Sequence, residues 1–257
     1  MIASAPLLRV DGLHKRFGGL TATDAVSLAL APGELHAVIG PNGAGKTTLI
    51  GQLTGEIRPD AGRIGFAGED ITRLAVDVRA RRGLARSFQV TSIFAGFTAL
   101  DNVALAVQAH AGHSFQFWAD AGRDAALREP ALAMLDRVGL GARGDVPAGN
   151  LAHGEQRQLE IAMALATGPS LLLLDEPMAG MGREESSGMV DLLAGLKGDL
   201  TILLVEHDMD AVFALADRVT VLVYGRVIAT GPPAAIRADP AVRAAYLGET
   251  GGGGVGP

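Results

Sequence analysis

The segment GPNGAGKTT at residues 40–48 constrains the fold of this chain more than any other feature. It fits the pattern G-x-x-x-x-G-K-[ST], follows the apolar run LHAVI and precedes the helix-like segment TTLIGQL. Glycines allow successive backbone N–H groups to point inward at an anion, and the dipole of the following helix favours the same charge. The sequence therefore predicts a strand, a phosphate-binding loop and a helix, in that order. A glycine turn without a ligand is the alternative, and this context disfavours it.

Two side chains of this loop have the chemistry that a nucleoside triphosphate and its metal ion need. Lys46 supplies a positive charge to the β- and γ-phosphates, and Thr47 offers a hydroxyl group to Mg²⁺. The residues that we expect to bind the nucleotide here are Gly40, Pro41, Asn42, Gly43, Ala44, Gly45, Lys46, Thr47 and Thr48.

A second apolar strand, LLLLDEP at residues 171–177, ends in two acidic residues. A carboxylate at the end of a parallel strand is well placed to hold Mg²⁺ through water, and we expect this of Asp175. Glu176 is the candidate general base that polarises an attacking water. Two adjacent acids are more commonly a solvated turn, but the four leucines and the phosphate loop favour the catalytic interpretation.

The remaining segments predict an α/β fold. VSLAL (26–30) alternates apolar and polar residues, and GRIGFAGEDI (62–71) has the pattern of a strand and turn with Ile64 and Phe66 on one face. Residues 88–165 are rich in alanine and leucine and predict helices. The last third alternates apolar strands with helices, which is typical of a parallel sheet covered on both faces.

Composition excludes several classes of function. The net charge of the 257 residues is −6, so the chain has no global basic field for nucleic acid or an anionic membrane. With no cysteine, it has no disulfide framework and no thiolate chemistry. No apolar run approaches the ~18–20 residues that span a bilayer, and the N-terminus lacks the features of a signal peptide. We expect a cytoplasmic chain that docks on a membrane protein.

The segment NLAHGEQRQLE at residues 150–160 is a second candidate phosphate-binding helix start. It resembles the signature segment of ABC-type ATPases, usually written LSGGQ. The order of motifs matches that family: the phosphate loop, SFQ, this segment, LLLLDEP and VEHD. A closer resemblance, to the ATP-binding subunits of branched-chain amino-acid importers, rests on KRFGGLTA, ARSFQ, LAHGEQRQLEIAMALA, DEPMAGM, VYGRVIATG and VRAAYLGE.

The resemblance implies a fold and a domain organisation. The fold is a P-loop NTPase with a RecA-like parallel sheet core, an antiparallel β-subdomain and an inserted α-helical subdomain. Residues 1–249 would form the ABC ATP-binding domain, with the helical subdomain and signature region at about 88–165. The glycine-rich tail, 250–257, is expected to be disordered.

The resemblance also assigns residues. In that family two ATP-binding subunits pack head to tail, and each ATP lies between one chain's phosphate loop and the other chain's signature. Gln89 would reach Mg²⁺ and the attacking water, and His207 would contact the γ-phosphate. Phe17 would stack on adenine, although core packing is an alternative. The signature residues that would meet the nucleotide are Ala152, His153, Gly154 and Glu155.

Three residues depart from the family pattern. Ala152 replaces the signature serine, Glu155 replaces the usual glutamine, and Gly182 stands where a side chain normally crosses the dimer interface. We expect weaker but working γ-phosphate sensing, because the backbone N–H groups remain.

Outside these motifs, four arginines form a basic cluster: Arg79, Arg81, Arg82 and Arg86. The cluster suggests a solvated helix face or, alternatively, contact with a membrane subunit or lipid headgroups.

The resemblance predicts an ATP-hydrolysing subunit that energises uptake of branched-chain or related amino acids, with ATP and Mg²⁺ as cofactors. Its implied partners are a second ATP-binding subunit (self or paralogue), transmembrane permease subunits at the cytoplasmic face of the inner membrane and, indirectly, a solute-binding protein.

Three alternatives remain. The same ATPase could drive transport of urea, short amides or a lipid, or the chain could be a GTPase-like switch or a non-catalytic binding subunit. The chain lacks the guanine-reading N-K-x-D motif, which disfavours the switch. The catalytic residues named above argue against the non-catalytic subunit.

Overall fold

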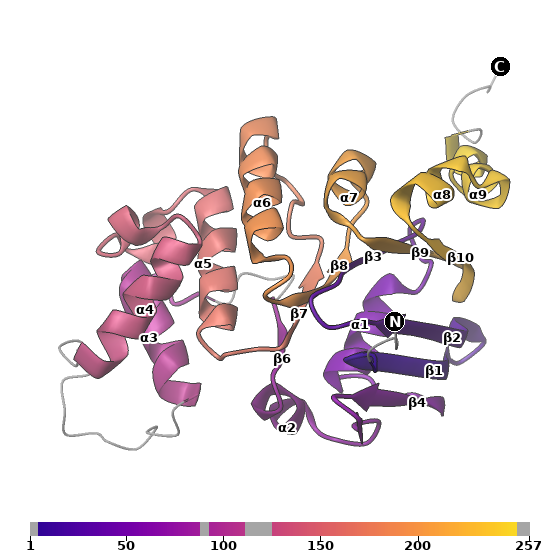
Figure 1. Ribbon diagram of the computed structural model, residues 1–257, viewed down its shortest axis with the longest axis horizontal. Coiled ribbons are helices and arrows are strands. Elements are labelled where there is room, and N and C mark those ends of the chain that lie inside the picture. The colour runs from indigo at the N-terminus through magenta and orange to yellow at the C-terminus, as the bar shows by residue number, and fades with distance from the viewer. Residues whose placement is uncertain (1–4, 88–92, 111–124, 251–257) are drawn as a thin grey trace. The chain divides into compact units, whose positions relative to one another are not determined.

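The computed structural model describes residues 5–87, 93–110 and 125–250, with the backbone alone from 246 onward (Figure 1). The chain divides into two compact units: Met1–Arg79 together with Lys197–Pro257, and the second unit, Ala80–Leu196. Gln89, the segment 111–124 and the tail beyond residue 250 lie outside the described residues.

The first unit contains an antiparallel sheet with the strand order β2-β1-β4-β5. These strands are β1 (Leu8–Phe17), β2 (Leu20–Leu30), β4 (Ala61–Phe66) and β5 (Glu69–Asp70). Leu8 pairs with Leu30 on one side and with Phe66 on the other. Ile64 and Phe66 are both buried, which confirms the prediction that they share a face.

The same unit contains parallel strands that lead to the phosphate loop. The strand β3 (Leu35–Ile39) pairs in parallel with both β8 (Thr201–Val205) and β9 (Arg218–Val223). Every residue of β3 and β8 is buried, as expected for parallel strands covered on both faces. The strand β10 (Arg226–Gly231) is antiparallel to β9. The helices are α1 (Lys46–Thr54), α7 (Met209–Leu215), α8 (Pro233–Ala238) and α9 (Pro240–Thr250). The helix α2 (Val76–Arg81) begins in this unit, and its last two residues belong to the second.

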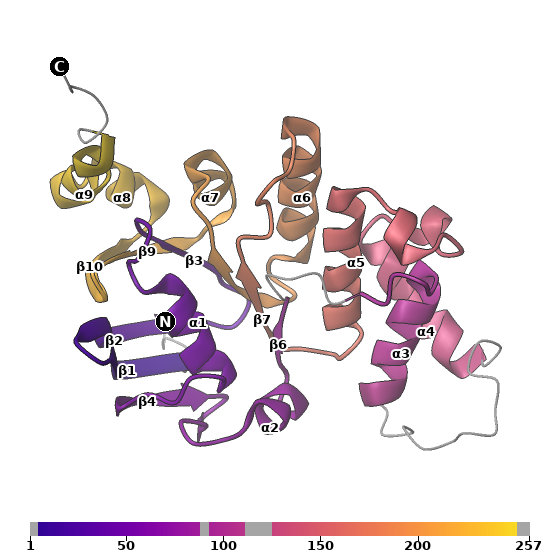
Figure 2. The ribbon, with the colours of Figure 1, turned by 180° about the vertical axis from the view of Figure 1, so that it is seen from behind.

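The second unit joins two parallel strands to a group of helices. The strand β6 (Leu84–Arg86) pairs with β7 (Leu171–Asp175). The helices are α3 (Ala99–His110), α4 (Ala125–Arg137), α5 (His153–Leu165), α6 (Arg183–Leu196) and the short 3₁₀ turns Gly141–Arg143 and Ala148–Asn150. Helices α3 and α4 lie beside α5 in Figure 1 and Figure 2, and the three pack on one another. The predicted helical character of this region is confirmed over the described residues. In the part of the chain that the structure describes, no helix has the length and hydropathy needed to cross a membrane.

Arg79 contradicts the prediction of a solvated helix face. Its side chain is buried, and its guanidinium donates to the carbonyl oxygens of Gln52 at 2.8 Å and Leu53 at 2.6 Å. It also donates to the carbonyl oxygens of Leu74 and Thr72. Because the last carbonyls of a helix lack partners within it, Arg79 acts as a cap for the C-terminus of α1. Burial lowers the pKa of Arg79 from its ordinary value.

We expect Arg79→Met to destabilise the first unit by about 3 kcal/mol, because several buried carbonyls would lose their donor at once. The measurement is the midpoint of urea unfolding, followed by circular dichroism. Arg82→Met, at an exposed residue of the same cluster, is the matched control and should leave the midpoint within experimental error. Equal midpoints for the two variants would contradict the capping role.

Candidate functional site

The phosphate loop lies close against neighbouring backbone, and this explains two of its glycines. A Cβ atom on Gly40 would lie 2.0 Å from the carbonyl oxygen of Leu222, and one on Gly45 would lie 2.1 Å from that of Ala22. Gly45 also has a φ of 102° and is the N-cap of α1. The loop is tied to the β9–β10 turn by a 2.9 Å hydrogen bond from the Gly225 N–H to the Ala44 carbonyl oxygen. The predicted strand, loop and helix are therefore present as a close-packed unit.

Lys46 places its positive charge at this loop. Its side chain is buried, and Nζ donates to the carbonyl oxygens of Gly40 at 2.6 Å and Pro41 at 3.0 Å. Asn42, Gly43 and Thr47 are exposed at the start of the helix. A buried ammonium among backbone groups, beside a helix N-terminus, is suited to binding a polyphosphate.

Phe17 ends the strand β1 and is 48% exposed, so the alternative that it packs in the core is wrong. The Nζ atom of Lys15 lies 5.4 Å from the centroid of its ring. An exposed aromatic ring at a strand end is available for stacking on a planar base.

His207 follows the buried strand β8, and its side chain is 64% exposed. Its backbone N–H donates to Glu206 Oε2 at 2.9 Å, and its Nδ1 lies 3.7 Å from the same oxygen. Glu206 is fully buried and was not singled out from the sequence, although its place before His207 in VEHD was a usable signal. The Glu206 carboxylate therefore holds the backbone of His207 just beyond the end of β8.

The two predicted acids lie at the end of β7 in the second unit. The side chain of Asp175 is buried, and its Oδ2 accepts a hydrogen bond from Arg86 Nη2 at 3.3 Å. Glu176 has a φ of 50°, in the left-handed region that non-glycine residues rarely adopt. Such backbone costs about 1–3 kcal/mol and is concentrated at functional sites. Arg86 was predicted only as part of a basic cluster, and its contact with Asp175 was missed.

The signature segment begins α5, with Ala152 as N-cap and His153 as the first helical residue. Glu155 is used within the unit: Oε2 accepts the Ala152 N–H at 2.9 Å, and Oε1 lies 3.0 Å from Arg143 Nε. This is one half of a capping box, since alanine has no acceptor for the other half. Glu155 therefore supports the helix start in this structure.

Glu185 lies at the start of α6 and contacts two helix N-termini. Its Oε1 accepts the Gly154 N–H at 3.2 Å, and its Oε2 accepts the Gly182 N–H at 3.1 Å. Both contacts place a carboxylate where a helix dipole favours an anion. Glu185 was not predicted from the sequence, because its contact with Gly154 joins residues far apart in the chain.

The candidate residues are distributed over both units. The first unit contains Phe17, the phosphate loop and His207, and the second contains the two acids and the signature segment. Thr47 in the first unit and Asp175 in the second each have a side-chain oxygen, the type of atom that Mg²⁺ prefers as a ligand. Among the described residues, no group of three or more His, Cys, Asp or Glu forms a larger metal cluster.

Comparison with known proteins identifies close relatives. A model of the ABC transporter family matches residues 23–179, and a model of branched-chain amino acid ATP-binding cassette transporters matches residues 226–251. The high-affinity branched-chain amino acid transport ATP-binding protein BraF of Pseudomonas aeruginosa is 40% identical over 253 residues, covering 96% of this chain and 99% of its own. The corresponding protein LivG of Escherichia coli is 40% identical over 255 residues, with the same coverage.

Solved structures agree with the sequence relatives. A nucleotide-free ATP-binding cassette from an ABC transporter matches with a TM-score of 0.83 and 29% identity, covering 94% of this chain and 98% of that chain. The ADP conformation of such a cassette matches with a TM-score of 0.83 and 30% identity, covering 95% and 100%. These neighbours confirm the predicted fold class.

Proposed function

Because this chain belongs to the ABC transporter family of ATP-binding proteins, we propose that it hydrolyses ATP to drive an importer of branched-chain or related amino acids. The observation that carries the proposal is the 40% identity to BraF and LivG over nearly the whole chain. The GTPase-like switch is set aside by the family match.

The chemistry follows from the residues of the two units. The loop N–H groups and Lys46 bind the β- and γ-phosphates, while Thr47 and Asp175 would hold Mg²⁺, which neutralises charge on the phosphate oxygens when bound. Glu176 accepts a proton from water as the water oxygen bonds to the γ-phosphorus. The bond from that phosphorus to the β,γ-bridging oxygen breaks, which releases ADP and phosphate. His207 orients the γ-phosphate.

The signature helix serves a nucleotide that is bound mainly to a second ATP-binding subunit. In the described chain the Gly154 N–H donates to the Glu185 carboxylate. A γ-phosphate arriving from the second subunit needs the same N–H, so the two anions compete for one helix N-terminus. ATP closes the dimer when the phosphate replaces the carboxylate, and hydrolysis removes the phosphate and lets the dimer open.

We expect Glu185→Gln to tighten ATP-driven dimerisation by about fivefold, because a charge at a helix N-terminus contributes roughly 0.3–1 kcal/mol per site. Glutamine keeps an acceptor for the Gly182 N–H but competes less strongly with a phosphate. The measurement is sedimentation velocity with ATP in a variant that cannot hydrolyse it. Glu184→Gln, on the same turn of α6, is the control. Unchanged or weaker dimerisation of Glu185→Gln would contradict the competition.

The cargo is tested with the complete transporter, reconstituted in proteoliposomes with its permease subunits and solute-binding protein. We expect leucine, isoleucine or valine to stimulate ATP hydrolysis and to accumulate inside. If urea, a short amide or a lipid stimulates ATP hydrolysis and branched-chain amino acids do not, the stimulating compound is the cargo and the proposed cargo is wrong. The same preparation tests whether the chain binds the permease at the cytoplasmic face.

A further inference from the structure

The base-stacking candidate Phe17 has a cation fixed on one side of its ring. Lys15 precedes it by two positions on β1, and alternate residues of a strand lie on the same face. The separation of 5.4 Å between Lys15 Nζ and the ring centroid is within the ~6 Å range of a cation–π interaction. The ring remains 48% exposed, so a surface for a ligand is still available.

Asp60 holds this lysine in place. Its Oδ1 accepts from Lys15 Nζ at 2.8 Å, and its Oδ2 accepts from the Arg16 backbone N–H at 2.8 Å. Its own N–H donates to the His14 carbonyl oxygen at 2.9 Å. The hydrogen bond from Lys15, followed by that from the Arg16 N–H, keeps the pKa of Asp60 below its ordinary value, so the carboxylate is charged at neutral pH. One residue thus contacts three consecutive positions that lead to Phe17.

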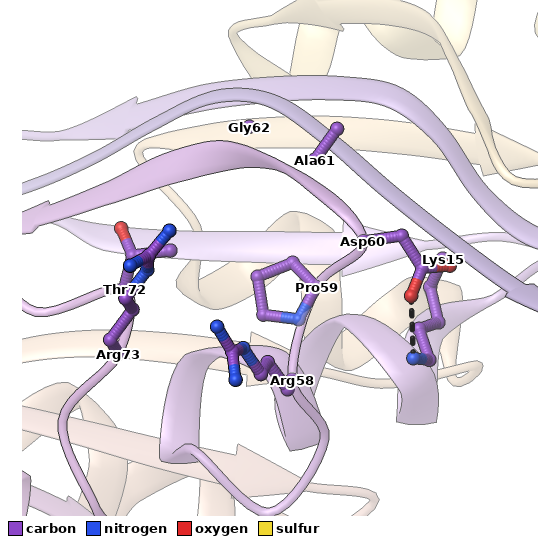
Figure 3. Close-up of a pocket in the computed structure, with 8 residues that line it drawn as sticks. All are labelled: Lys15, Arg58, Pro59, Asp60, Ala61, Gly62, Thr72 and Arg73. Carbon is purple, nitrogen blue, oxygen red and sulfur yellow. Dashed lines mark hydrogen bonds and ion pairs between the residues drawn. The ribbon is translucent and has the colours of Figure 1, made fainter.

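Lys15 and Asp60 are among the residues that line a surface hollow of about 500 Å³, and Figure 3 shows these two side chains beside each other. The dashed line joins Lys15 to Asp60, while Arg58 and Arg73 line other parts of the hollow. The lysine side chain is 17% exposed, against 48% for Asp60, so the ammonium is the more enclosed partner of the pair.

The strand β1 is also tied to the phosphate-loop helix. Gln52 of α1 is fully buried, and its Nε2 donates to the His14 carbonyl oxygen at 3.3 Å. Its Oε1 accepts from Thr23 Oγ1 at 3.1 Å. The His14 carbonyl therefore accepts hydrogen bonds from both Gln52 and Asp60. These bonds connect α1, the helix that follows the phosphate loop, to the strand that ends in Phe17.

We propose that Asp60 and Lys15 are positioning residues for the nucleobase: Asp60 holds the ammonium against one face of Phe17, and adenine stacks on the other face. This rests on the proposed function, in which Phe17 receives the base. The cation withdraws electron density from the ring and restricts its rotation, and both effects favour stacking of an electron-rich purine. Neither side chain needs to touch the nucleotide.

The test compares ATP with inorganic tripolyphosphate, which has the phosphates but no base, by calorimetric titration. We expect Phe17→Ala to weaken ATP binding about tenfold, and Lys15→Met and Asp60→Asn to weaken it about threefold each. All three should bind tripolyphosphate within about twofold of the unaltered chain. In a Phe17→Ala background, Lys15→Met should weaken ATP binding little further, because the lysine acts through the Phe17 ring.

Asp11→Asn is the matched control, since it makes the same substitution on the same strand and breaks the exposed ion pair with Arg9. Asp11→Asn should change neither the affinity for ATP nor the affinity for tripolyphosphate. If Lys15→Met and Asp60→Asn leave ATP affinity unchanged while Phe17→Ala weakens it, the positioning role is wrong and the proposed function stands. If Lys15→Met and Asp60→Asn weaken the binding of ATP and of tripolyphosphate equally, the positioning role is also wrong, because the substitutions would then have damaged the whole site. If the proposed function is wrong, the unaltered chain should bind neither ATP nor tripolyphosphate.

Discussion

Glu176→Gln is expected to lower kcat for ATP hydrolysis by at least about 10³-fold while ATP still binds. The substitution keeps the size and one hydrogen-bond acceptor of the side chain but removes the basic carboxylate, and general-base catalysis is commonly worth about 10²–10⁴. The backbone of Glu176 is left-handed, with a φ of 50°, and such strained backbone is concentrated at functional sites. Steady-state phosphate release, together with equilibrium ATP binding, measures the two effects separately.

The same variant should accumulate as an ATP-bound dimer, because the phosphate that bridges two subunits is not removed. Glu184→Gln is the control for the substitution itself, since Glu184 is an exposed residue of α6. Hydrolysis by Glu176→Gln at the rate of this control would reject Glu176 as the base.

Lys46→Ala is expected to weaken ATP binding by at least about 100-fold, equivalent to ~2.7 kcal/mol. Lys46 brings a buried positive charge to the loop and donates to the carbonyls of Gly40 and Pro41, so its loss removes both the charge and a support of the loop. The measurement is a calorimetric titration with ATP and with tripolyphosphate, and the affinity for both should fall.

Lys197→Ala is the control for Lys46→Ala. Lys197 donates to the Leu215 carbonyl oxygen and pairs with Asp217 at 2.8 Å, so its substitution removes a lysine whose contacts with these two residues lie outside the phosphate loop. Circular dichroism establishes that both variants fold. If Lys46→Ala binds ATP as tightly as Lys197→Ala, the loop does not recognise phosphate through its lysine.

The parts of the fold that the sequence predicted are those whose signal is local. The phosphate loop is specified within nine residues, and the structure places it between β3 and α1 as predicted. The acids at the end of β7 could be placed in the same way, because four leucines mark the buried part of that strand. The roles of Asp175, Glu176 and His207 stay predictions, and Gln89 lies outside the described residues.

The contacts that the sequence could not predict join residues distant in the chain. Arg79 belongs to a run of arginines that resembles a solvated face, yet folding brings it to the end of α1, where unpaired carbonyls can be satisfied. Asp60 and Lys15, and likewise Glu185 and Gly154, meet only through the tertiary fold. Nothing in the spacing of these residues indicates their partners.

The dependence of ATP hydrolysis on protein concentration tests the central claim most directly. If one chain supplies the phosphate loop and a second supplies the signature helix, the rate per chain should fall toward zero as the protein is diluted. It should recover when the second ATP-binding subunit or the permease is added. A rate per chain that stays constant at concentrations where sedimentation shows only monomer would contradict the account.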